Sequence, residues 1–178
     1  MKHLLAKQED LERINALFLL TREQMEKEGN RTWSNGYPTK DDFQADIKEG
    51  HSYLYFEKGV LIAYIHASFD PRDDFFWRSR SASKLTQLRK DTGMKEDEGF
   101  LLLHRLMIAP AYQGRGFAEK ILADQAKLYP QRMMMFAVYP ANAKALRVYD
   151  RYGFSNAGIY SAFEYGDVSC FLYFKRYE

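Results

Sequence analysis

The chain has 178 residues, a net charge of +2 and a hydrophobic content of 46%, which fits one soluble globular domain, over residues 1–178, with a sizeable core. The near-neutral charge gives no argument for a nucleic-acid or membrane-binding surface, and no stretch approaches the ~20 apolar residues of a membrane span. Cys170 is the single cysteine, which excludes an internal disulfide and a cysteine-based metal site. The first residues lack the apolar run of a signal peptide, so we expect a cytoplasmic protein.

The first third of the chain shows helical periodicity followed by a hairpin pattern. Apolar residues such as Leu11, Ile14 and Phe18 recur at helical spacing, and Thr39 precedes a second helical segment as a typical N-cap. The residues Glu57-Lys58-Gly59 indicate a tight turn between two strands. The predicted elements are a strand over 3–6, helices over 9–28 and 40–48, and strands over 51–56 and 60–68.

The segment from Phe69 to Gly99 is polar and basic, with Phe75, Phe76 and Trp77 adjacent to one another. A partial helix is predicted over 83–91. Loops of this length without regular structure are often functional or disordered. Two interpretations stay open: the basic residues meet an acidic acceptor, or they form a solvated surface.

The central stretch of the chain runs from Leu101 to Leu122. An apolar strand over 101–109 leads through Pro110 and a glycine-containing turn into a helix over 115–128. Such a turn directs several backbone N–H groups and the positive end of the helix dipole toward one point. It therefore predicts a site for a phosphate or pyrophosphate, with glycines that allow close approach to the backbone.

The last third of the chain predicts a strand, a helix and a C-terminal hairpin. The three methionines Met133 to Met135 are interpreted as core residues rather than metal ligands. A parallel pair of strands joined by a helix, followed by a hairpin, makes an α+β fold with a mixed sheet. The predicted elements are a strand over 132–139, a helix over 142–152 capped by Gly153, and strands over 154–163 and 168–177.

Two short motifs carry a family resemblance. The turn lacks both the P-loop and the dinucleotide fingerprints, but Gln113-x-x-Gly116-x-Ala118 resembles the acetyl-CoA signature of the GNAT superfamily of N-acetyltransferases. The segment from Asn142 to Phe154, N-x-x-A-x-x-x-Y-x-x-x-G-F, resembles the second conserved block of the same enzymes. The resemblance covers the chain well from Phe100 onward, whereas the first third matches only in element order.

This resemblance implies a fold and a cosubstrate site. The fold is a mixed central β-sheet flanked by helices, with a V-shaped opening between the two central parallel strands. Acetyl-CoA is the implied cosubstrate: the turn binds the pyrophosphate through backbone N–H groups, the pantetheine arm pairs with the central strand, and a backbone N–H near Met107 or Ile108 polarises the acetyl carbonyl. The implied binding residues are Leu106, Met107, Ile108, Gln113, Gly114, Arg115, Gly116, Phe117, Ala118, Asn142 and Tyr149.

Two residues are predicted to catalyse. By its place in the second block, Tyr149 is the general acid that protonates the CoA thiolate, and it shares a helix face with Asn142. His104, on the central strand, is the candidate base because the imidazole pKa near 6.5 suits removal of a proton from an amine. A buried structural histidine is the alternative for His104. His51 and His66 are weaker candidates for the base.

The predicted function is transfer of an acetyl group from acetyl-CoA to a primary amine of a small molecule or peptide by direct attack. The alternative is a non-catalytic acyl-CoA-binding sensor or regulatory module. The expected partners are acetyl-CoA and an amine acceptor, without nucleic acid, membrane or metal, and a homodimer is one option for its assembly. We expect Trp33, Tyr37 and the segment 69–99 to govern acceptor choice, although Trp33 and Tyr37 also fit as residues that pack on the core.

Overall fold

The computed structural model describes residues 1–69, 82–96, 98–162 and 168–177. It is a mixed α+β structure with a seven-stranded sheet in the order β1-β2-β3-β4-β5-β7-β6. The chain divides into two compact units. We call them the amino-terminal unit (Met1–Ala67 with His104–Leu122) and the carboxy-terminal unit (Ser68–Leu103 with Ala123–Glu178).

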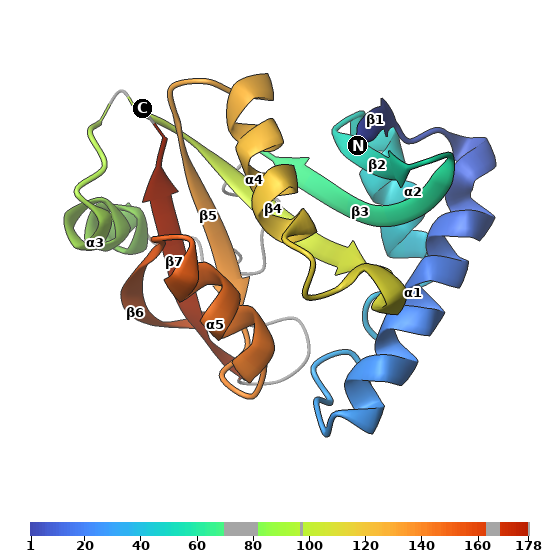
Figure 1. Cartoon of the computed structure of the whole chain (residues 1–178). Coiled ribbons are helices and arrows are strands. Elements are labelled where there is room, and N and C mark those ends of the chain that lie inside the picture. Colours follow the sequence, from blue (N-terminus) through green and yellow to red (C-terminus); the bar gives the residue numbers. More distant parts are fainter. Residues whose placement is uncertain (70–81, 97, 163–167, 178) are drawn as a thin grey trace. The chain divides into compact units, whose positions relative to one another are not determined.

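The amino-terminal unit contains two helices beside an antiparallel set of strands (Figure 1). It also holds the second half of strand β4 and the start of helix α4. Its elements are β1 (Lys2–Leu5), η1 (Gln8–Asp10), α1 (Leu11–Lys27), α2 (Lys40–Glu49), β2 (Ser52–Glu57), β3 (Val60–Ser68) and η2 (Pro110–Tyr112).

Local sequence signals fix the ends of helix α2 and of the β2–β3 hairpin. The hydroxyl of Thr39 accepts a hydrogen bond from the backbone N–H of Asp42, and Gly50 ends the helix at a φ of 79°. Lys58 and Gly59 both have positive φ, 50° and 81°, as a two-residue hairpin turn of the I′ kind requires. These signals explain why the helix and hairpin form where the sequence predicted them.

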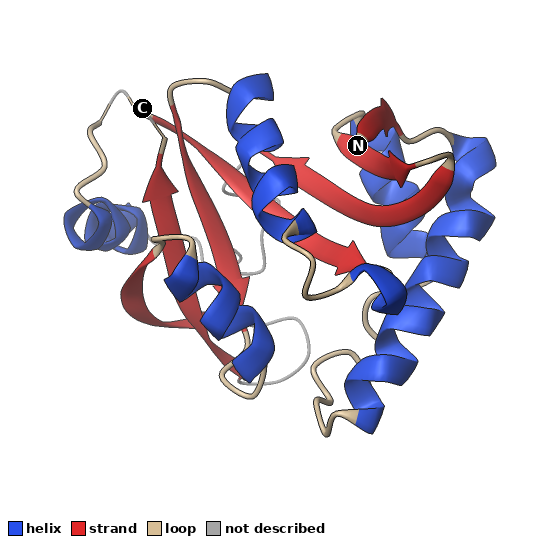
Figure 2. Cartoon of the chain, in the orientation of Figure 1, coloured by secondary structure: helices blue, strands red, loops and turns tan. Residues whose placement is uncertain are grey.

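The core of the amino-terminal unit lies between helices α1 and α2 and strand β3. Phe18, Phe43 and Tyr64 pack edge to face with ring centroids 5.5 and 5.6 Å apart. Met107 of β4 is fully buried in the same cluster. Figure 2 shows the two helices side by side in this unit.

The carboxy-terminal unit is built on a parallel pair and an antiparallel hairpin (Figure 2). Strand β4 pairs in parallel with β5 from Gly99–Arg132 to Leu102–Met135, and β7 lies between β5 and β6. Met133 and Met135 are core residues, as expected. The elements are α3 (Ala82–Thr92), β4 (Gly99–Ile108), α4 (Phe117–Leu128), β5 (Arg132–Val138), α5 (Ala143–Arg151), β6 (Ser155–Ala162) and β7 (Val168–Arg176).

The structure confirms the predicted α+β fold, with a mixed sheet flanked by helices. The predicted order of helices and strands is found, with small shifts at their ends; α4, for example, begins at Phe117 and not at Arg115. The partial helix predicted over 83–91 is α3. The adjacent aromatic residues Phe75 to Trp77 lie outside the described residues.

Candidate active site

The turn between β4 and α4 is fixed by its own side chains. The amide nitrogen of Gln113 donates to the carbonyl of Ile108 at 2.9 Å, and the backbone N–H of Gln113 donates to the carbonyl of Pro110 at 3.2 Å. Helix α4 begins at Phe117, so its first N–H groups have no partner within the helix. Gln113 therefore shapes the turn whose N–H groups the sequence assigns to pyrophosphate.

Gly114 and Gly116 give this turn its backbone conformation. Their φ angles are 71° and 76°, in the left-handed region where other residues are strained. Apart from each glycine and its two neighbours in the chain, no atom of the described residues lies within 4 Å of the position that a Cβ would take there. The turn thus combines a conformation that requires glycine with open space beside the backbone, and both properties fit a bound phosphate.

Arg115 lies between the two glycines but folds back over the turn. Its guanidinium carbon lies 5.2 Å from the ring centroid of Tyr112 and 5.7 Å from that of Phe117. Lys120 lies 5.4 Å from the same Phe117 ring. Two cations therefore stand near the start of α4, where they would favour an anionic ligand.

Strand β4 has an irregularity at Arg105, whose φ is 51°. Strict alternation would direct His104 and Arg105 to opposite faces of the sheet. Instead, the His104 ring lies 5.9 Å from that of His66, and Nη1 of Arg105 lies 3.3 Å from Oδ1 of Asp46, which itself lies 3.8 Å from Nε2 of His66. A bulge-like break at Arg105 therefore brings both side chains into one cluster.

His66 and Asp46 of this cluster also belong to a chain of hydrogen bonds across α2, β2 and β3. Nε2 of His66 lies 2.9 Å from Oε2 of Glu49, and Nδ1 of His66 lies 3.0 Å from Oγ of Ser52. Ser52 Oγ lies 3.2 Å from the hydroxyl of Tyr64, which donates to Oδ2 of Asp46 at 2.8 Å. We call these five residues the α2–β3 network.

Burial and charge shift the pKa values of this region. Burial raises the pKa of Asp46, while Arg105, His66 and the hydrogen bond from Tyr64 oppose that rise. Burial also lowers the pKa of His104 well below its usual range, and the charges of Arg105 and His66 lower it further. His104 is therefore an uncharged imidazole at neutral pH, the form that accepts a proton.

The second motif lies in the carboxy-terminal unit. Asn142 is the N-cap of α5, where its side-chain oxygen accepts from the backbone N–H of Ala145 at 3.1 Å. Only its amide NH₂ group is left to donate to a ligand. The N-cap position also means that Asn142 lies just outside the helix face that carries Tyr149.

Tyr149 is buried in an aromatic cluster of the carboxy-terminal unit. Its ring stacks on Phe136 of β5 with centroids 4.5 Å apart, and it lies 5.5 Å from Phe154 and 5.8 Å from Tyr173. Burial raises the pKa of the Tyr149 phenol well above its usual value, so the hydroxyl keeps its proton at neutral pH. The protonated phenol thus belongs to a side chain that packs against three other rings.

The structure separates the two aromatic residues that were predicted to line the acceptor site. Trp33 packs against the core, with its ring 5.8 Å from that of Phe18. Tyr37 instead lies under the guanidinium of Arg105, at 5.3 Å from its ring centroid. Only Tyr37 is thus brought next to the residues around His104.

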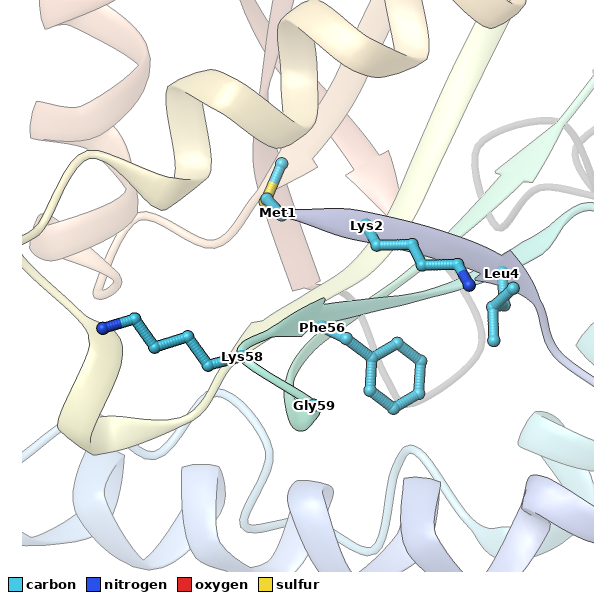
Figure 3. Close-up of a pocket in the computed structure, with 6 residues that line it drawn as sticks. All are labelled: Met1, Lys2, Leu4, Phe56, Lys58 and Gly59. Atoms are coloured by element: carbon cyan, nitrogen blue, oxygen red, sulfur yellow. The ribbon is translucent and has the colours of Figure 1, made fainter.

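Among the described residues, no group of three or more His, Cys, Asp or Glu side chains could hold a metal ion, and no helix is long and apolar enough to cross a membrane. A hollow of about 400 Å³ lies along β1 and the β2–β3 turn, lined by Met1, Lys2, Leu4, Phe56, Lys58 and Gly59 (Figure 3). None of the predicted site residues lines it, so we assign it no part in the chemistry.

Comparison with known proteins shows the family to which the chain belongs. The model of the acetyltransferase (GNAT) family matches residues 15–154. The chain belongs to this family. It is an acetyltransferase, and acetyl-CoA is its cosubstrate. The resemblance of the two motifs is thereby confirmed at the level of the GNAT family.

Solved structures share the GNAT fold at low sequence identity. A GNAT acetyltransferase from Streptococcus agalactiae 2603 aligns with a TM-score of 0.79 and 19% identity over 99% of this chain and 95% of that one. The putative acetyltransferase yncA from Salmonella typhimurium, solved with its cofactor acetyl-CoA, aligns with a TM-score of 0.62 and 16% identity over 100% and 94%. An agmatine N-acetyltransferase aligns with a TM-score of 0.61 and 13% identity over 99% of both chains. No curated protein matches the chain in sequence.

The sequence of this GNAT chain did not single out Asp46 or Glu49, and it indicated His66 only as a weaker candidate for the base. One signal was present for Asp46: it follows Phe43 by three residues and precedes Ile47, so it stands on the buried face of α2. A carboxylate at such a position requires a buried partner. The identity of that partner, Arg105, depends on the fold.

Proposed function

We propose that residues 1–178 act as one domain that transfers the acetyl group of acetyl-CoA to a primary amine of a small molecule or peptide. One observation carries this proposal. A single continuous segment of the amino-terminal unit holds uncharged His104 at the irregularity of β4 and then leads into the open glycine turn at the start of α4. The candidate base and the candidate pyrophosphate site are thus built on adjoining elements.

In the proposed reaction, the backbone N–H groups of the turn, with Gly114, Gly116 and Ala118, bind the pyrophosphate. The backbone of Leu106 to Ile108 pairs with the pantetheine arm, and an N–H near Met107 or Ile108 polarises the acetyl carbonyl. These roles belong to the main chain, which is why the burial of the Met107 side chain in the core is compatible with them.

Proton transfer is assigned to two side chains. His104 takes a proton from the acceptor, so that the neutral nitrogen attacks the thioester carbonyl. The new C–N bond forms, the C–S bond breaks, and Tyr149 gives its proton to the departing thiolate. The second proton that the acceptor nitrogen loses on becoming an amide then restores the phenol of Tyr149. The phenol of Tyr149 is protonated at neutral pH, as this role requires, although burial raises its pKa and so makes it a weaker acid.

The acceptor is a separate question, because the fold of a GNAT protein does not fix its substrate. Polyamines, amino acids, aminoglycoside-type amines and peptide N-termini are all amine acceptors to test. The agmatine N-acetyltransferase that shares the fold adds agmatine to this panel. The test is release of free CoA thiol with each amine, together with the mass of the acetylated product.

The panel also separates the enzyme from the alternative, a sensor that binds acetyl-CoA without turning it over. If the protein is an enzyme, thiol should be released only when a suitable amine is present. The product should be roughly 42 mass units heavier than that amine, because an acetyl group replaces one hydrogen. Binding of acetyl-CoA by calorimetry without thiol release for any amine would favour the sensor.

A further inference from the structure

The backbone N–H groups in the second half of strand β4 point alternately to its two edges, as in any strand. The N–H of Ala109 donates to the carbonyl of Ile62 in β3 at 2.8 Å. By alternation, the N–H groups of Leu106 and Ile108 point to the opposite edge. The carbonyl of Ile108 lies on that edge too, where the side-chain amide of Gln113 donates to it at 2.9 Å. This is the edge that the proposed function gives to the pantetheine arm and the acetyl carbonyl.

The break at Arg105 determines which N–H groups reach that edge. A one-residue break in a strand exchanges the two edges and the two faces for the residues that follow it. The φ of Arg105 is 51°, in the left-handed region. A residue other than glycine is strained there and keeps the conformation only where its surroundings hold it. The direction of the Leu106 and Ile108 N–H groups therefore depends on the contacts that hold Arg105.

Asp46 makes the charged contact with Arg105 from helix α2. Its Oδ1 lies 3.3 Å from Nη1 of Arg105, and its Oδ2 accepts a hydrogen bond from the hydroxyl of Tyr64 in β3 at 2.8 Å. One carboxyl group, only 3% exposed, thus ties α2 to both β3 and β4. An unprotonated carboxyl oxygen accepts from a guanidinium in the ionised group and in the neutral acid alike. The contact therefore does not require a particular protonation state of Asp46.

Two other contacts act near the break. The ring centroid of Tyr37 lies 5.3 Å from the guanidinium carbon of Arg105, and Met107 is fully buried in the core of the amino-terminal unit. Met107 anchors the strand after the break, whereas Asp46 acts on the strained residue itself. Asp46 also carries the charge opposite to that of the guanidinium, which makes it the contact to test first.

We propose that Asp46 is a positioning residue for acetyl transfer: through Arg105 it holds the left-handed conformation at the break of β4, and it thereby directs the N–H groups of Leu106 and Ile108 to acetyl-CoA. This inference rests on the proposed function, in which the backbone of this segment binds the pantetheine arm and the acetyl carbonyl. The physical link is the main chain, because the φ and ψ of one residue fix the direction of the planar peptide groups beside it.

The first test is NMR of the free protein, which does not depend on activity. A residue in the left-handed conformation has its amide and α protons close together, so Arg105 should give a strong intraresidue NOE in the wild type. Asp46→Leu is similar in size but cannot accept a hydrogen bond. We expect this variant to lose the strong NOE at Arg105 and to shift the amide signals of Leu106 and Ile108. A folded Asp46→Leu variant that keeps the NOE and both signals overturns the proposal.

Asp10→Leu is the matched control, because Asp10 has the same kinds of contact elsewhere in the amino-terminal unit. Its Oδ1 lies 3.3 Å from Nη1 of Arg13, and its Oδ2 accepts the backbone N–H of Lys7 at 2.9 Å. Asp10→Leu should lower stability but leave the NOE at Arg105 unchanged. Equal loss of this NOE in both variants would show a general effect of destabilisation, which contradicts the proposal.

Two double variants keep the test decisive if Asp46→Leu does not fold, because they leave no buried guanidinium unpaired. Asp46→Leu/Arg105→Ala places a residue that is strained at positive φ at the break, whereas Asp46→Leu/Arg105→Gly places one that accepts positive φ without strain. We expect the alanine variant to lose the wild-type amide positions of Leu106 and Ile108, and the glycine variant to keep them in part. An alanine variant that retains both positions overturns the proposal.

Calorimetry then relates the break to cosubstrate binding. The ligands are acetyl-CoA and 3′-phospho-ADP, the fragment of CoA that ends before the pantetheine arm. Asp46→Leu and the alanine double variant should bind acetyl-CoA about tenfold more weakly, roughly the worth of one hydrogen bond, with an unchanged Kd for the fragment. The glycine double variant should recover part of the acetyl-CoA affinity. An unchanged affinity for acetyl-CoA, or equal weakening of both ligands, contradicts the proposal.

Kinetics separate this inference from the proposed function. With an acceptor, the kcat of Asp46→Leu should fall by up to ~10²–10³, the usual cost of losing one oxyanion-type donor. If the wild type acetylates no amine, the proposed function fails, and the NOE and the calorimetry still decide on Asp46. If the wild type acetylates an amine and Asp46→Leu does so with the same kcat, the role of Asp46 alone is refuted.

Discussion

His104 and Arg105, adjacent on strand β4, place their side chains in the same cluster: one ring lies beside His66, and the guanidinium pairs with Asp46 at 3.3 Å. The Arg105–Asp46 pair is largely buried, with side-chain exposures of 12% and 4%. Removing one partner of a buried pair leaves an uncompensated charge. This relationship makes the pair the first target for mutation.

Arg105→Met should lower the free energy of unfolding by about 3–5 kcal/mol, the usual cost of leaving one buried charge unpaired. Urea denaturation measures this loss. Adding Asp46→Asn removes the stranded carboxylate and should restore part of the stability. An Arg105→Met variant as stable as the wild type would show that Arg105 does not compensate the charge of Asp46.

The turn before α4 gives a prediction about cosubstrate binding. Gly116→Asp places a carboxylate beside the pyrophosphate and should weaken acetyl-CoA binding more than tenfold, since each 1.4 kcal/mol of repulsion is about tenfold in affinity. Gly59→Asp is the matched control because Gly59 has a similar φ, 81° against 76°, and open space, but lies in the β2–β3 turn. Calorimetry on both folded variants compares them. Equal affinities would exclude the turn as the phosphate site.

Tyr37 and Trp33, which were both predicted to govern acceptor choice, should respond differently to substitution by alanine. Tyr37→Ala should raise the KM for the acceptor several-fold without changing the Kd for acetyl-CoA, because Tyr37 lies against Arg105 and not against the turn. Trp33→Ala should instead lower stability, by about 3 kcal/mol or less, because Trp33 packs on the core. A large KM effect from Trp33→Ala in a stable protein would restore its predicted role in acceptor choice.

The lowered pKa of His104 predicts a dependence of stability on pH. An unfolded histidine titrates at about 6.5, whereas folded His104 binds its proton only at lower pH. The unfolded state therefore holds more protons as pH falls below about 6.5, and the wild type loses stability there. His104→Gln removes this penalty, so its stability relative to the wild type should improve from pH 7 to pH 5. A constant difference in urea denaturation would show that His104 titrates normally.

Much of this GNAT fold could be predicted from the sequence because its signals are local. Thr39 and Gly50 mark the ends of α2, and the turn motif around Gly116 marks the start of α4. The α2–β3 network could not be predicted in this way. Its members come from three elements, and its ion-pair partner Arg105 lies far from Asp46 in the chain and meets it only through a break in alternation.

The side-chain chemistry was predicted only in part. Tyr149 was chosen because the motif from Asn142 to Phe154 resembles the second GNAT block, but its stacking on Phe136 depends on which strand α5 covers. Asn142 was predicted to share a helix face with Tyr149, but it is the N-cap of α5, and an N-cap residue does not follow the helical repeat. The roles assigned to both residues in catalysis and binding stay predictions.

The most direct test of the proposed mechanism is single-turnover acetyl transfer by the Tyr149→Phe variant with an acceptor from the amine panel. This change deletes the hydroxyl and keeps the ring that stacks on Phe136, so folding and acetyl-CoA affinity should be nearly unchanged. Because general acid catalysis is typically worth ~10²–10⁴ in rate, the chemical step should slow by about that factor. A chemical step as fast as that of the wild type would contradict the account and leave Tyr149 as a packing residue.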